Sequence, residues 1–152
     1  MNRSYQTLHY LLPVLMLAFL GSCNQVEEQP EPFNTVDSEQ VLSDLEYLAS
    51  DELEGRKTNT EGNPMAQEYI EERFQNLSLQ MFGDSYRHLF DHSSPRSEEE
   101  FVDAVNLIGY VEGSMNPDRY IVVMAHYDHL GVRDDEIYNG ADDNASGTGG
   151  LM

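Results

Sequence analysis

The chain has 152 residues, with 28 Asp and Glu against 8 Lys and Arg, so its formal net charge is -20. The length suits one domain, and the acidity argues against nucleic acid or an anionic membrane surface as a partner, because both are polyanions. Hydrophobic residues make up 39% of the chain and aromatic residues 10%, which excludes a wholly disordered polymer.

Residues 1–22 are typical of a bacterial signal peptide. The apolar run 11–20 is about half as long as the roughly 20 residues that a bilayer-spanning helix needs. Small residues then precede Cys23, the only cysteine, as in the lipobox of bacterial lipoproteins. This resemblance implies cleavage before Cys23 and lipidation of its thiol; the alternative is an ordinary secretory signal with an incidental cysteine. We expect an exported lipoprotein of the outer membrane, cell surface or periplasm, attached to the membrane only by its lipid.

The residues after Cys23 divide into a tether and a folded part. Residues 23–36 are rich in Glu and Pro, which predicts a flexible tether behind the lipidated cysteine. We expect the fold to occupy residues 37–152. Apolar spacing predicts a helix over 37–48 capped by Asp37, and a second helix that starts at Asn63-Pro64. The polar stretch 50–62 between them is expected to be a loop.

The β pattern follows these helices. Apolar residues alternate over 105–111, a turn-rich break follows, and 120–125 is continuously apolar. This order predicts an edge strand paired with a central strand that is buried on both faces. Together with the helices it predicts an α/β fold.

Candidate metal-binding residues follow the predicted central strand. Polar ligand types at the carboxyl end of such a strand are typical of α/β functional sites. His126 and Asp128 are two residues apart, so on an extended chain they project to the same side. The imidazole can then bind a metal while the carboxylate orients its ring. The alternative is a strand end that meets solvent and carries polar residues for that reason.

A second constellation lies at residues 139–147. Asp142, Asp143 and Asn144 stand in sequence between two glycines, and crowded like charge favours a bound cation. An EF-hand calcium loop is one alternative, because positions 1, 3, 5 and 6 match, although its Glu at position 12 would fall beyond residue 152 and no helix is expected before it. An acidic turn without metal is the other.

Together, AHYDHLG and NGADDNASG make the stretch 120–151 resemble the co-catalytic di-zinc aminopeptidase family of zinc exopeptidases. That family includes glutamate carboxypeptidase II-like and glutaminyl cyclase-like members. LASDELEGRKTNTEGNPMAQEYIEERF resembles the family's N-terminal helix-loop-helix, so the resemblance covers about 37–152. It implies the three-layer, phosphorylase/hydrolase-like α/β sandwich of the zinc exopeptidases, with a mixed sheet that is incomplete at the C-terminus.

The resemblance also implies roles for single residues. His126 is expected to bind one zinc ion, and Asp143 to bridge two. Asp128 is expected to be the catalytic carboxylate that orients His126. Asn144 would follow Asp143 through a cis peptide bond, and Asp142 is interpreted as part of the turn. Manganese or cobalt are possible substitutes for zinc at such donors.

The activity that the resemblance implies is that of a metallo-aminopeptidase. A water activated by two zinc ions would hydrolyse the first bond of a peptide with a free N-terminus; carboxypeptidase and dipeptidase action stay open. The family's Glu pair, which supplies the general base and a ligand, and its later ligands follow the second motif. We therefore expect an N-terminal fragment that is inactive alone. The alternative is a non-catalytic surface lipoprotein that acts as a binding module on the same fold.

Overall fold

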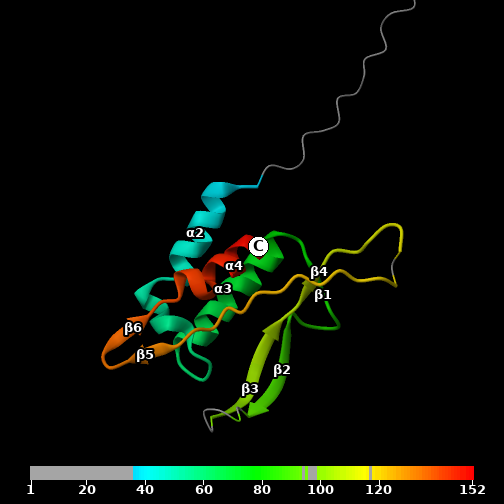
Figure 1. Cartoon of the computed structure of the whole chain (residues 1–152). Helices are drawn as coiled ribbons and strands as arrows, with labels where there is room; N and C mark the ends of the chain where they lie inside the picture. The colour runs from blue at the N-terminus through cyan, green and yellow to red at the C-terminus, as the bar shows by residue number, and fades with distance from the viewer. Residues whose placement is uncertain (1–35, 94, 96–98, 117) are drawn as a thin grey trace, which may run out of the picture. The chain divides into compact units, whose positions relative to one another are not determined.

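The computed structural model describes residues 36–93, 95, 99–116 and 118–152 (Figure 1). The predicted signal peptide, the lipidation site Cys23 and all of the predicted tether except Val36 lie outside these residues, so they stay predictions. In the described part of the chain, no helix has the length and apolarity needed to cross a membrane.

The two predicted helices are confirmed. Helix α2 spans Ser38–Leu48, and the Asp37 carboxylate caps it by accepting a hydrogen bond from the Gln40 backbone N–H at 3.1 Å. Helix α3 spans Gly62–Asn76, so it begins slightly before the predicted Asn63-Pro64 start. Asn63 does not cap this helix as expected. Its buried amide donates instead to the carbonyl oxygen of Arg56 at 2.8 Å.

The stretch between these helices is not the polar loop that was expected. A 3-10 segment, η1, spans Asp51–Arg56, and the side chains of Leu53 and Arg56 are fully buried. Gly55 has a φ of 69°, and a β-carbon there would overlap the carbonyl oxygen of Tyr138. This position therefore requires glycine, because the η1 backbone lies directly against the β5–β6 hairpin. The polar composition of residues 50–62 gave no indication that part of this stretch is packed in the interior.

Three two-stranded antiparallel sheets complete the described fold. They pair β1 (Gln80–Met81) with β4 (Gly109–Tyr110), β2 (Arg87–Ser93) with β3 (Glu100–Leu107), and β5 (Gly131–Arg133) with β6 (Glu136–Tyr138). In the β2–β3 pair, Leu89 lies opposite Val105, and the register shifts between Phe90 and His92.

The predicted central strand over 120–125 is wrong for this structure. These residues belong to no strand, and their side chains are largely exposed, with Ile121 at 95%. A strand requires a hydrogen-bonded neighbour, and in this structure β3 pairs with β2 and β4 pairs with β1, while no strand pairs with residues 120–125. Helices and sheets are mixed, as an α/β class requires. The three-layer sandwich with a mixed sheet is absent from the described residues and stays a prediction.

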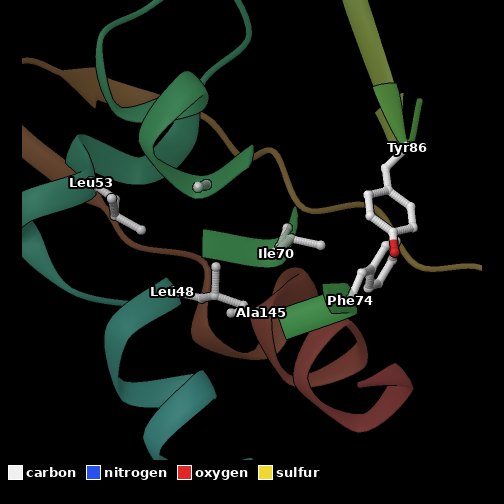
Figure 2. Close-up of a cluster of buried hydrophobic side chains, with 7 residues drawn as sticks. Leu48, Leu53, Ile70, Phe74, Tyr86 and Ala145 are labelled. Carbon is white, nitrogen blue, oxygen red and sulfur yellow. The ribbon is translucent and has the colours of Figure 1, made fainter. Parts of the chain in front are cut away.

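The core joins the helices to the C-terminal segments. Seven buried side chains form it: Leu48, Leu53, Ala66, Ile70, Phe74, Tyr86 and Ala145. Figure 2 shows Leu48 and Ala145 beside each other, from α2 and from the η2 turn (Ala141–Ala145). Helix α4 (Ser146–Leu151) follows η2 and lies near α2 and α3 (Figure 1). The second predicted motif is therefore anchored in the core through one alanine.

Candidate metal centre

The structure brings the two predicted ligands together. His126 Nε2 lies 2.9 Å from Asp143 Oδ1, although 16 residues and the β5–β6 hairpin separate them along the chain. The two side chains are 52% and 71% exposed. The pair therefore lies at the surface, where additional ligands, water and substrate have access.

Asp128 orients the His126 ring mainly through its backbone. His126 Nδ1 lies 3.0 Å from the Asp128 carbonyl oxygen, whereas the Asp128 carboxylate Oδ1 is 3.6 Å away, beyond hydrogen-bond distance. The other carboxylate oxygen accepts a hydrogen bond from the Thr58 hydroxyl at 3.3 Å. In this geometry the expected contact between Asp128 and the imidazole exists, but the closest oxygen is the carbonyl.

The turn at residues 139–147 is built from local contacts. Gly140 has a left-handed backbone (φ 58°), and a β-carbon there would overlap the His129 ring and the Asp143 carbonyl. The Gly147 N–H donates to Asn144 Oδ1 at 3.1 Å. The peptide bond between Asp143 and Asn144 is cis, as the resemblance implies. Within this turn the Asp143 carboxylate is directed at His126, whereas the amide oxygen of Asn144 faces the Gly147 backbone.

The segment that carries His126 has no regular secondary structure and depends on distant partners. The Thr148 hydroxyl lies 3.1 Å from the carbonyl oxygens of both His126 and Asn144, so it links this segment to the turn. The Tyr127 hydroxyl donates to the Val105 carbonyl at 2.8 Å. Burial, reinforced by the negative charge of Asp128, raises the pKa of Tyr127 to about 12.

Arg56 is the residue of this region that sequence analysis missed. It is fully buried, and the hydrogen bonds it donates within the described residues end on backbone carbonyls of Leu48, Tyr127, Asn139 and Gly140. Burial lowers the pKa of its guanidinium, and the charge of Asp128 opposes that change. Hydrophobic periodicity cannot identify a buried arginine.

The His126–Asp143 contact combines two donor types that can bind a cation. A carbonyl only accepts hydrogen bonds, so Nδ1 carries the proton when it lies against the Asp128 carbonyl. A neutral imidazole then directs the lone pair of Nε2 at a carboxylate oxygen 2.9 Å away. Two acceptors at this distance repel each other unless a second proton or a metal ion lies between them. Imidazole nitrogen and carboxylate oxygen are ligands that zinc binds, so the two residues fit a zinc ion in type.

The pair supplies only part of a coordination shell. Zinc usually takes four ligands, and among the described residues no group of three or more His, Cys, Asp and Glu is placed to hold a metal ion. The EF-hand alternative is wrong, because the β5–β6 hairpin occupies 131–138, where that motif needs a helix. Asp142 is exposed, and its carbonyl accepts from the Ser146 hydroxyl at 3.1 Å.

Comparison with known proteins identifies the segment that holds both candidate ligands. Residues 106–152 match the family model described as peptidase family M28. No curated protein and no solved structure matches the chain. Peptidases of family M28 are typically zinc-dependent, which agrees with the donor types of His126 and Asp143. The predicted resemblance is confirmed for residues 106–152, which match the model of peptidase family M28, the co-catalytic zinc exopeptidase family.

Proposed function

We propose that this chain contributes to a zinc-dependent aminopeptidase site, with His126 and Asp143 as ligands of the co-catalytic pair. The observation that carries the proposal is the 2.9 Å approach of His126 Nε2 to Asp143 Oδ1 within the segment that matches family M28. A lone pair and a carboxylate at this distance share either a proton or a metal ion, and the donor types suit zinc. Asp128 is proposed to fix the ring rather than to bind metal.

The chemistry divides between the metal and the protein. Bound zinc supplies Lewis acidity, which polarises a scissile carbonyl and makes water a better nucleophile near neutral pH. The protein side chains supply orientation: the Asp128 carbonyl holds the proton on Nδ1 of His126, so Nε2 stays free to bind. The exposure of both side chains leaves room for a peptide end.

Charge supports a substrate with a free N-terminus. Asp143 is exposed beside His126, the preceding residue Asp142 is also exposed, and the chain as a whole has a net charge of -20. At long range, the net negative charge of the chain attracts the positive ammonium group of a peptide N-terminus and repels a C-terminal carboxylate. We therefore favour aminopeptidase action over carboxypeptidase action. The three-layer zinc-exopeptidase sandwich is the fold that we propose for the catalytic domain.

Zinc titration of the 152-residue chain by isothermal calorimetry tests the ligand assignment. We expect weak binding that Asp143→Asn abolishes and that the adjacent Asp142→Asn leaves unchanged. His126→Ala should also abolish it, with the exposed His92→Ala as its control. Equal losses in the Asp142 and Asp143 variants would contradict the assignment, because they would indicate general charge attraction.

Turnover is expected to need more than this chain. The described residues bring only two candidate ligands together, whereas the proposed mechanism needs two filled zinc sites and a general base. The chain alone should therefore not hydrolyse leucine p-nitroanilide in the presence of zinc. Chelator-sensitive release of nitroaniline by the purified chain, unchanged on repurification, would refute this expectation.

The location of the protein is a separate proposal. Cys23 lies outside the described residues, so export and lipidation depend on the sequence pattern alone. Expressed in a bacterium with labelled palmitate, the chain should incorporate label and sediment with membranes, and Cys23→Ser should do neither. A soluble secreted product with unlabelled Cys23 would favour the ordinary secretory signal. The matched control is Ser22→Ala, which keeps a small residue before the cysteine.

A further inference from the structure

We propose that Arg56 is the positioning residue of the candidate zinc site. Three of its hydrogen bonds end on the two segments that carry the ligands. Nε donates to the Tyr127 carbonyl at 2.7 Å, Nη1 to the Asn139 carbonyl at 2.7 Å, and Nη2 to the Gly140 carbonyl at 3.1 Å. Tyr127 lies between His126 and Asp128, and Gly140 opens the turn that holds Asp143. This inference rests on the proposed function.

The chemistry of arginine suits this role. Its planar guanidinium carries five N–H donors in a fixed fork, so one side chain can satisfy carbonyls from several chain segments at fixed spacing. A lysine ammonium is a compact charge that cannot span the same carbonyls. Because Arg56 is fully buried, water cannot easily replace a bond that a substitution removes.

Arg56 is itself anchored in the helices. Nη1 also donates to the carbonyl of Leu48, the last residue of α2. The Arg56 carbonyl accepts from the Asn63 amide at 2.8 Å, and Gln67 donates to Asn63 at 2.8 Å, so the backbone of Arg56 is tied to α3. The guanidinium therefore transmits the position of the helical core to both ligand segments.

Neighbours of Arg56 reinforce the same link. The Asn139 amide donates to Asp51 at the start of η1 at 2.6 Å. Thr58 donates to the Asp128 carboxylate at 3.3 Å. The stretch 51–58 therefore forms hydrogen bonds to both ligand segments on either side of Arg56. Arg56 donates to both segments with one side chain.

Hydrogen–deuterium exchange of the metal-free chain provides the first test. The Ala145 amide donates to the Gly140 carbonyl at 3.1 Å, so its exchange reports on the turn. Arg56→Lys should reduce protection at Ala145 by about tenfold while protection at Ile70, in the middle of α3, stays unchanged. Should Arg56→Lys fail to fold, Arg56→Ala with added methylguanidinium, expected to restore protection, replaces it.

Arg73→Lys is the matched control. Arg73 is also largely buried, but its Nε pairs with Asp44 at 2.9 Å and links α3 to α2. The Arg73→Lys variant should lower exchange protection in the helices. Its loss of protection at the Ala145 amide should be no larger than its loss at Ile70. Equal loss at Ala145 and Ile70 in Arg56→Lys would overturn the proposal, since Arg56 would then be a general stabiliser.

Zinc calorimetry on the same variants gives the second readout. Arg56→Lys should weaken zinc binding by about tenfold, the size of effect that residues supporting metal ligands have, and Arg73→Lys should not weaken it. Unchanged affinity in Arg56→Lys would overturn the proposal. If the unmodified chain binds no zinc, the proposed function fails, whereas the exchange result still decides whether Arg56 positions His126 and Asp143.

Discussion

The two segments that carry the candidate ligands are positioned in different ways. The turn at 139–147 obtains its shape from nearby residues, with left-handed Gly140, the Asn144–Gly147 hydrogen bond and Ala145 in the core. The segment 126–129 has no such local contacts beyond the one between His126 and Asp128. Distant residues place it, and Arg56 and Thr148 are the ones that also contact the turn. A ligand motif can therefore be recognised from a few adjacent residues, although the positions of its side chains depend on residues that are distant in sequence.

The largest expected effect comes from breaking the local shape of the turn. Gly140→Ala should lower the free energy of unfolding by about 2–4 kcal/mol, because alanine is strained at φ 58° and its β-carbon overlaps His129. Gly83→Ala is the control, with a φ of 81° and no atom within 4 Å of the added carbon. It should cost about 1 kcal/mol. Urea unfolding measures both, and equal costs would show that close packing at Gly140 is unimportant.

An intermediate effect is expected from the link between the segments. Thr148→Val keeps the side-chain shape but removes the hydroxyl beside the His126 and Asn144 carbonyls, which should cost about 1–2 kcal/mol. The Thr148→Val variant should also bind zinc more weakly. Thr60→Val removes a hydroxyl that bonds within its own loop, to Lys57, and should leave zinc binding intact. If both variants weakened zinc binding equally, the Thr148 hydroxyl would have no specific role in positioning the two ligand segments.

The smallest effect concerns Tyr127 and is pH-dependent. Tyr127→Phe removes the donor to the Val105 carbonyl and should cost about 1 kcal/mol at neutral pH. Burial raises the pKa of Tyr127 from 10 to about 12, so the neutral phenol stabilises the fold fully below pH 10. That contribution is lost as the pH rises through 12. Urea midpoints should therefore fall less between pH 9 and pH 12 in Tyr127→Phe; an identical fall would contradict this assignment.

Much of the helical fold could be predicted because it follows from local patterns. The Asp37 cap and the buried face of α3 at Ile70 and Phe74 follow from the spacing of polar and apolar residues within a few turns of helix. The apolar run 120–125 led to a wrong prediction of a central strand. Strand formation depends on pairing partners, which composition does not reveal. In the site, the approach of His126 to Asp143 agrees with the motif. Arg56 could not be predicted, since only the folded chain shows a polar residue surrounded by carbonyls.

The most direct test of the central claim is nitrogen NMR of the His126 imidazole during zinc titration. Long-range proton–nitrogen correlation distinguishes Nε2 from Nδ1, and His126→Ala assigns the signals among the 5 histidines. We predict that zinc shifts Nε2 while Nδ1 keeps its proton against the Asp128 carbonyl, and that Asp143→Asn removes the response. A shift confined to Nδ1, or no shift of His126 at zinc levels that saturate binding, would contradict the account.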